Sequence, residues 1–203
     1  ERLAGDSFVG AQNGPLGPID VQRAGLILLM RLRSGEANIA AGRGAPAAEM
    51  LVQNADLETR LDKNRLVELL PSAMIPEPFK GPTVVPEAPT VASLIAGSRL
   101  ALGNAYLTAG KSADALAQFR AVRAYRANWP ATSDHANTLK IADSWAGLGL
   151  VEAAYQSRDY DGAWQLLMQV GRPWDMPPEF EAKRKQLTDQ ITAARNNRGF
   201  RVR

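Results

Sequence analysis

The sequence predicts an all-α fold, built as an irregular stack of helix pairs with a proline-rich extended segment in its middle. Three observations lead to this prediction. Apolar residues recur at helical spacing over most of the second half of the chain. No segment alternates polar and apolar residues for long enough to form a strand. Short turns containing Gly, Asn, Asp or Pro separate the candidate helices.

The chain is expected to begin with an extended segment followed by an N-terminal helical region. Residues 1–19 are rich in Gly and Pro, which favours an extended lead-in. Residues 20–70 then change to a helical pattern. Asp20 can cap a helix over 21–33, and this helix should end near Gly35.

Two further helices are predicted before a proline-rich strap. The first covers 46–57 and begins at Pro46, because the missing N–H of proline costs nothing in a first turn. The second covers 62–70 and stops at Pro71. Residues 71–89 contain six prolines, so we expect a polyproline-like strap there. Its apolar side chains favour packing on this protein over capture of a partner, which remains the alternative.

Residues 90–195 are predicted to form an almost continuously helical domain, closed by a C-terminal capping helix and followed by a basic tail over 196–203. Thr90 and Ser112 can cap the first two helices. The long third helix carries its apolar residues along one stripe, as a buried face requires. The expected helices cover 90–109, 113–125, 133–156, from Asp159 or Asp161 to Val170, and 178–195.

The composition excludes several classes of active site. The 203 residues include no Cys and one His, which rules out zinc–thiolate sites, catalytic thiols and two-histidine metal motifs. His135 and its neighbour Asp134 do not form a natural dyad, because consecutive helical residues do not face each other. Asp159 and Asp161 lack the glycine and distal glutamate of a calcium loop. We therefore expect no catalytic residue, no metal, no cofactor and no enzymatic activity.

Basic residues are concentrated at the C-terminus of a chain whose formal net charge is +3. The arginines that follow the last acidic residue could contact an anionic partner, although a solvated, frayed terminus is the simpler explanation. No aromatic ladder accompanies them, so nucleic acid is not an expected partner. No apolar run approaches the ~20 residues that cross a bilayer. The four arginines are Arg195, Arg198, Arg201 and Arg203.

The clearest pattern in the second half is Leu102-Gly103-x2-Tyr106-x8-Ala115-x3-Phe119. Gly103 and Ala115 are small, so two helices can approach closely there, and Tyr106 and Phe119 can fill the space beside that crossing. At every one of these positions the segment 96–129 resembles the tetratricopeptide repeat (TPR) family.

Two degenerate copies of this pattern extend the resemblance to about half of the chain. Ala47 precedes Ala115 by twice the ~34-residue period of the family. Ala163 follows Ala115 by more than one such period, so an insertion separates the second copy from the third. We call these two separations, from Ala47 to Ala115 and from Ala115 to Ala163, the first and second repeat intervals. The first copy consists of Gly35, Ala47 and Leu51, and the third of Leu150, Val151, Ala154, Ala163 and Leu167.

The resemblance implies a right-handed solenoid whose concave face binds a peptide or the surface of a partner. Aromatic residues on that face suit protein recognition, although Trp145 and Tyr155 could equally pack on the inserted segment or the strap. Leu100 stands where the family's carboxylate-binding clamp needs a Lys, so we do not expect that clamp here. The implied groove residues are Leu100, Asn104, Leu107, Thr108, Trp145, Leu148, Glu152 and Tyr155.

The expected function is therefore a protein–protein interaction module, an adaptor or a peripheral subunit of a larger bacterial assembly, with other proteins as partners. The alternatives are a nucleic-acid-binding helical repeat and a helical domain of a larger enzyme. The 18 Arg against 6 Lys suggest a GC-rich bacterial genome. The start at Glu1 without an initiator Met suggests a trimmed form, and the periplasm is slightly favoured over the cytoplasm.

Overall fold

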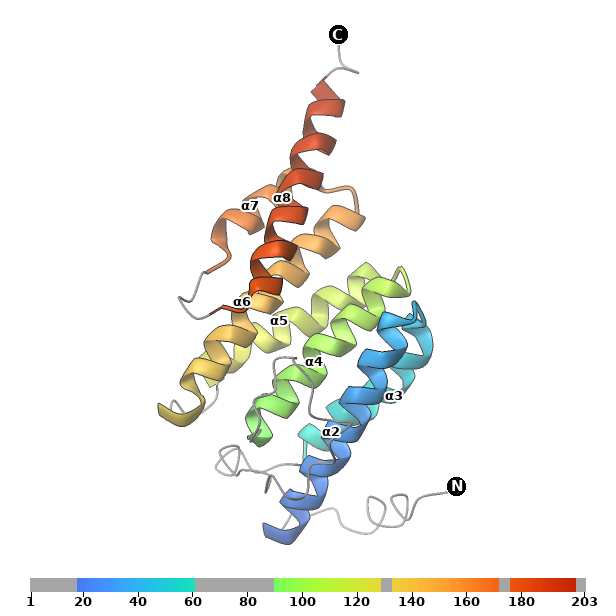
Figure 1. Ribbon diagram of the computed structural model, residues 1–203, viewed down its shortest axis with the longest axis vertical. Coiled ribbons are helices and arrows are strands. Elements are labelled where there is room, and N and C mark those ends of the chain that lie inside the picture. The colour runs from blue at the N-terminus through green and yellow to red at the C-terminus, as the bar shows by residue number, and fades with distance from the viewer. Residues whose placement is uncertain (1–17, 61–89, 129–132, 172–175, 200–203) are drawn as a thin grey trace.

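The computed structural model describes residues 18–60, 90–128, 133–171 and 176–199. These ranges contain seven helices and no β-strand, which confirms the all-α prediction. The helices lie side by side in one elongated stack, with the last helix pointing away from the rest (Figure 1). The predicted helix over 62–70, the strap over 71–89 and the lead-in up to residue 17 lie outside the described residues.

The seven helices form three consecutive hairpins and a single last helix. Their bounds are α2 Pro18–Ala40, α3 Gly44–Glu58, α4 Val91–Thr108, α5 Ser112–Asn128, α6 Ser133–Gln156, α7 Tyr160–Gln169 and α8 Pro178–Gly199. Each hairpin joins a first helix (α2, α4 or α6) to a second helix (α3, α5 or α7) that packs against it. The first helices also pack on one another in order, and α8 packs on both α6 and α7, so α8 takes the next place in the row of first helices.

The three hairpin turns have the same backbone geometry. Gly42, Gly110 and Arg158 have positive φ angles of 72°, 73° and 64°. In each turn the positive-φ residue donates its N–H to the carbonyl three residues earlier, and the next residue donates to the carbonyl five residues before itself. This is the Schellman arrangement that ends a helix at a left-handed residue. The three turns are separated by the same two repeat intervals that the sequence pattern predicted.

The helices of each hairpin cross at equivalent small residues. Ala47, Ala115 and Ala163 are fully buried at the start of the three second helices. One turn later the second helices place Leu51, Phe119 and Leu167 against the first helices, and all three are buried. The hairpins therefore share one internal construction, and the two repeat intervals relate them.

The predicted end of the first helix near Gly35 is wrong. Helix α2 continues to Ala40 and ends at the turn that contains Gly42. Gly35 instead makes room for the second helix, because a Cβ on Gly35 would lie 2.7 Å from the side chain of Leu51. Gly35 therefore marks a place where two helices cross closely, and not the end of a helix.

Two caps predicted from the sequence, Thr90 and Asp159, are present, and two others, Asp20 and Ser112, are not. The Thr90 hydroxyl accepts a hydrogen bond from the Ser93 N–H at 3.1 Å, and Asp159 accepts one from the Gly162 N–H at 2.9 Å. Such bonds satisfy N–H groups that a helix start leaves open. Ser112, however, is the first residue of α5 rather than the capping residue before it. Asp20 lies inside α2, which begins at Pro18, so it does not cap that helix either.

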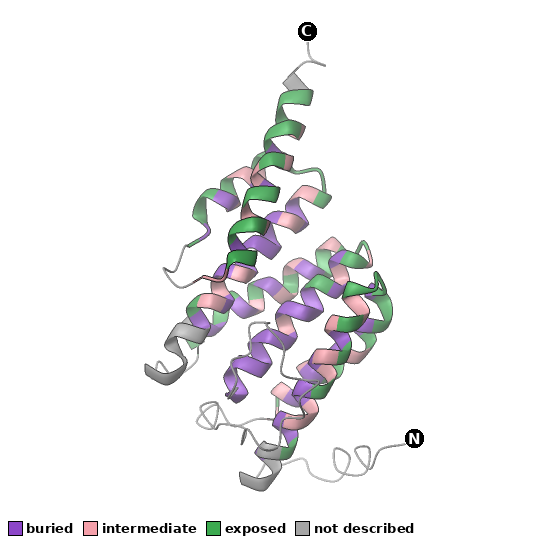
Figure 2. Cartoon of the chain, in the orientation of Figure 1, coloured by how far each residue is buried: buried purple, intermediate pink, exposed green. Residues whose placement is uncertain are grey.

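The apolar core runs through the stack in two connected clusters. The first joins the helices α2 to α6, and the second joins α6, α7 and α8. Figure 2 shows that α4 is buried along most of its length, whereas the far half of α8 is exposed. Trp145 packs against both clusters, so it connects the first two hairpins with the third hairpin and α8. No helix in the described ranges is long and apolar enough to span a bilayer.

Polar contacts tie the first two hairpins together. Asn54 on α3 is 1% exposed and donates its side-chain N–H groups to the Leu28 carbonyl at 3.2 Å and the Ser98 hydroxyl at 2.9 Å. Glu58 on α3 binds the Arg99 guanidinium at 2.8 Å and accepts a hydrogen bond from Tyr125 at 2.8 Å. Burial, followed by the charge of Glu58, raises the pKa of the Tyr125 phenol far above its ordinary value.

Candidate binding groove

The row of first helices forms one wall of a groove with a volume of about 640 Å³. Residues of α2, α4, α6 and α8 line it, and the ring of Phe119 reaches it from α5. The volume falls within the ~300–1,000 Å³ of protein pockets that hold ligands. The groove therefore lies where the sequence predicted a binding surface, along the first helices.

All four groove residues predicted on α4 line this groove. Leu100 and Leu107 are each 6% exposed and belong to the apolar core. Asn104 and Thr108 are exposed. These positions are three or four residues apart, so the helix carries them on one face. Helix α4 thus supplies both apolar and polar groups to the groove.

On α6 the structure brings three of the four predicted residues into the groove. Trp145, Leu148 and Glu152 line it, but Tyr155 does not. The lining positions continue from Glu152 to Gln156 rather than to Tyr155. Tyr155 lies on the side of α6 that faces α7, where its ring centroid is 5.4 Å from that of Tyr160. The prediction for Tyr155 is therefore wrong by one residue, because the groove position is occupied by Gln156.

None of the four groove residues on α2 was predicted, and three of them lie beyond the end predicted for that helix near Gly35. The first repeat interval would have found them, since it relates the α4 positions to lining residues of α2. The second repeat interval relates three of the same four α4 positions to lining residues of α6. The lining residues of α2 are Leu32, Glu36, Ile39 and Ala40, which correspond to Leu100, Asn104, Leu107 and Thr108.

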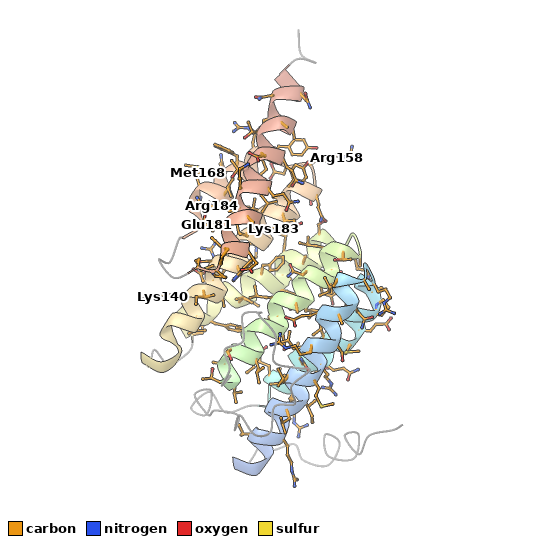
Figure 3. All side chains as sticks on the ribbon, viewed as in Figure 1. Lys140, Arg158, Met168, Glu181, Lys183 and Arg184 are labelled. Atoms are coloured by element: carbon orange, nitrogen blue, oxygen red, sulfur yellow. The ribbon has the colours of Figure 1, made fainter. Side chains whose placement is uncertain are left out.

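Helix α8 contributes a charged edge that was not predicted from the sequence. Glu179 and Lys183 line the groove, and the Lys183 ammonium binds Glu152 of α6 at 2.9 Å. Figure 3 labels Lys183 on α8 together with its neighbours Glu181 and Arg184. The repeat pattern gives no signal for Lys183, because the place of α8 in the row depends on how the last helix packs.

Trp145 supports one side of the groove. Its ring meets Phe180 of α8 edge to face, with centroids 5.2 Å apart and planes at 90°. The indole Nε1 is buried and has no hydrogen-bond partner within the described ranges. Trp145 therefore contributes to the groove and also holds α8 against α6.

Two glycines determine where the ring of Phe119 lies. A Cβ on Gly103 of α4 would come within 2.4 Å of this ring, and a Cβ on Gly149 of α6 within 2.5 Å. The ring therefore lies against backbone from two successive first helices. Because Gly149 also lines the groove, its missing side chain lets the Phe119 ring form part of the groove surface.

The charges of the groove are mainly negative. Glu36, Glu152 and Glu179 face a single lining base, Lys183. Glu36 binds Arg33 of its own helix at 2.8 Å, and Arg33 does not line the groove. Within the part of the chain that the structure describes, Glu179 makes no ion pair or hydrogen bond.

The four arginines predicted to contact an anionic partner have different places. Arg195 lies on α8, where it binds Asp161 at 2.9 Å and stacks over the ring of Trp164 at 5.3 Å. Helix α8 ends at Gly199, four residues later than predicted, so Arg198 is helical. Arg201 and Arg203 lie outside the described residues, as do the side chains of Arg198 and His135. Arg195 is therefore engaged within the protein.

No family model matches the chain, and neither curated proteins nor solved structures show significant similarity to it. No group of three or more His, Asp or Glu side chains that could hold a metal occurs in the ranges 18–60, 90–128, 133–171 and 176–199.

Proposed function

We propose that the groove binds a segment of another protein, and that the chain is a non-enzymatic, TPR-like interaction module. Such a module acts as an adaptor or as a peripheral subunit of a larger bacterial assembly. The observation that carries this proposal is the recurrence of the lining positions at the two repeat intervals. Equivalent positions on successive first helices make one continuous wall, and stacked helix pairs use such walls to bind extended partners.

The chemistry of the wall suits a polypeptide. The buried residues Leu100, Leu148 and Phe119 make the groove apolar at its base. The half-buried Trp145 is the kind of large side chain that anchors interfaces. The Asn104 side chain is exposed and makes no hydrogen bond within the described part of the chain. Its amide can donate and accept, so it can pair with a peptide main chain.

The TPR resemblance supports the same function. The contact between Gly103 and Phe119 is the close helix crossing that the resemblance implies. The repeated turns at Gly42, Gly110 and Arg158 give three hairpins of one kind, and about three such units are needed to bury their faces.

The proposal is tested by selecting peptides from a random peptide library against the wild-type protein and measuring their affinities for variants. Asn104→Arg plus Thr108→Arg puts bulk and charge into the groove at two exposed positions, so the fold is retained. The control, Gln53→Arg plus Ala117→Arg, adds the same charge at exposed positions on the second helices α3 and α5.

We expect the groove variant to weaken the selected peptides by at least about tenfold, which corresponds to ~1.4 kcal/mol, and the control to bind as the wild type does. Because the chain has no Cys, Asn104→Cys and Gln53→Cys each give a unique site for an environment-sensitive dye. Peptide binding should change the dye signal only at position 104. Equal affinities for the wild type and the groove variant would show that the groove is not the binding site.

A further inference from the structure

The side chains that line the groove have a formal charge opposite in sign to that of the whole chain. The formal net charge of the protein is +3, yet three carboxylates and one ammonium line the groove. A partner attracted by the whole protein would be acidic, whereas a partner attracted by the groove would be basic. The two attractions can therefore be distinguished by experiment.

The carboxylates of the groove lie in a row. Glu36, Asn104 and Glu152 occupy the same position on α2, α4 and α6, because the two repeat intervals separate them. All three line the groove. A peptide that crosses the three helices therefore meets a carboxylate, then a neutral amide, then a second carboxylate.

The distance between the two carboxylates limits the partner. Packed helices have axes about 8–10 Å apart, so positions two helices apart are about 16–20 Å from each other. An extended chain covers this distance in about five or six residues at ~3.3 Å per residue. Between the carboxylates the wall is apolar, with Leu100 and Leu148 on it.

We infer that the segment bound in the groove is an extended, basic and apolar stretch of a partner protein, with Lys or Arg at two positions about five or six residues apart and apolar residues between them. This inference rests on the proposed function. The partner's cations share Glu36 with Arg33 and Glu152 with Lys183, because a carboxylate accepts several hydrogen bonds. Asn104 lies between them and pairs with the peptide main chain.

The probes are synthetic peptides of one design, in which an apolar stretch separates two variable positions placed about six residues apart, so that both variable side chains point to the same face of an extended chain. The variable positions hold Lys, Gln or Glu in three matched peptides, and a fourth peptide holds two adjacent Lys. Fluorescence anisotropy at low and high ionic strength measures their affinities. We expect the spaced Lys peptide to bind about tenfold more tightly than the Glu peptide at low ionic strength, a difference that salt should reduce.

Two variants test the row directly. Glu36→Gln should weaken the spaced Lys peptide about threefold, and Asn104→Asp, which adds a carboxylate to the row, should strengthen it about threefold. Neither should alter binding of the Gln peptide. The matched controls are Glu49→Gln and Gln53→Glu, which make the same charge changes at exposed positions of α3 outside the groove.

Equal binding of the Lys and Glu peptides, or stronger binding of the Glu peptide, would overturn the inference. The proposed function would not be affected, because the library selection tests it separately. So would equal effects of the groove variants and their controls. Failure of the spaced Lys peptide to bind would also overturn it. If library peptides fail to distinguish the groove variant from the wild type, the proposed function is wrong, whatever these peptides do.

Discussion

The ring of Phe119 lies against Gly103, where a Cβ atom would come within 2.4 Å of the ring. The same ring lies against Gly149 of the next hairpin, where a Cβ would come within 2.5 Å. One side chain therefore fixes the distance between two helices of its own hairpin and the position of the hairpin that follows.

Gly103→Ala should destabilise the protein by at least about 1 kcal/mol. Overpacking a core costs about 1–3 kcal/mol, and the ring of Phe119 is 1% exposed and lies against the backbone at both Gly103 and Gly149. This cost outweighs the gain of up to ~1 kcal/mol that Ala has over Gly in a helix. Urea denaturation measures the difference.

Phe119→Leu should lower the free energy of unfolding less in the Gly103→Ala variant than in the wild type, because the smaller side chain relieves the clash with the methyl group added at position 103. Gly171→Ala is the control, since its Cβ would meet only the Ser144 hydroxyl at 3.8 Å. Additive effects of the two substitutions at 103 and 119 would mean that the contact is not tight.

Gly110→Ala should destabilise the protein by about 1–2 kcal/mol, the cost of a left-handed backbone for a residue with a Cβ. Nothing lies within 4 Å of the Cβ position and φ is 73°, so the effect is conformational rather than steric. Gly110→Asn should cost less, because Asn tolerates this conformation better. Urea denaturation of the two variants tests the order.

Arg158→Gly tests the equivalent turn of the third hairpin, and here the substitution should raise stability instead of lowering it. Arg158 has a φ of 64°, so we expect glycine to stabilise the protein by up to about 1 kcal/mol. Thermal and urea unfolding measure the change. A loss of stability would show that the contacts of the Arg158 side chain outweigh its backbone cost.

Tyr125 should make stability fall with rising pH above its ordinary pKa of 10. The phenol of the folded protein keeps its proton there, while that of the unfolded chain releases it, so the folded state binds more protons. This one group should lower the free energy of unfolding by up to about 1.4 kcal/mol per pH unit.

Tyr125→Phe removes this pH dependence. At pH 7 the variant should be less stable than the wild type, because it lacks the 2.8 Å hydrogen bond to Glu58. The difference should shrink as the pH rises above 10. Urea curves at a series of pH values test this. A difference that stays constant with pH would show that the Tyr125 phenol ionises as freely in the folded protein as in the unfolded chain.

The Asn54–Ser98 hydrogen bond should appear as a coupling energy of about 0.5–1.5 kcal/mol in a double-mutant cycle of Asn54→Ala and Ser98→Ala. The bond is 2.9 Å long and buried between α3 and α4. The control is a second double-mutant cycle, of Asn54→Ala and Ser144→Ala, which should give additive effects. Ser144 is a buried serine on α6 whose hydroxyl donates to the Lys140 carbonyl and not to Asn54.

The sequence predicted the helices well because their periodicity and the residues at their ends are local signals. The starts of α4 and α7 lie at the predicted caps Thr90 and Asp159. The error at Gly35 shows the limit of local signals, since a glycine at a helix end and a glycine at a helix crossing look alike. Only the pairing of Gly35 with Leu51 distinguishes the two cases.

Much of the groove could be predicted, because the repeat pattern carries it. Seven of the eight predicted residues line the groove. The contributions of α8 could not be found in this way, because the contacts of Trp145 with Phe180 and of Glu152 with Lys183 depend on how the last helix packs. Arg158 gave no signal either, since arginine is not a residue expected at a positive φ angle.

Within each hairpin the distances along the chain are constant, but the joints between hairpins differ in length, since the first repeat interval is longer than the second. An insertion or deletion at a joint therefore leaves the residue spacing within each hairpin unchanged. The spacing within a hairpin and the length of chain between hairpins are independent of each other, so a designer could change a joint while each hairpin keeps the spacing of its lining positions.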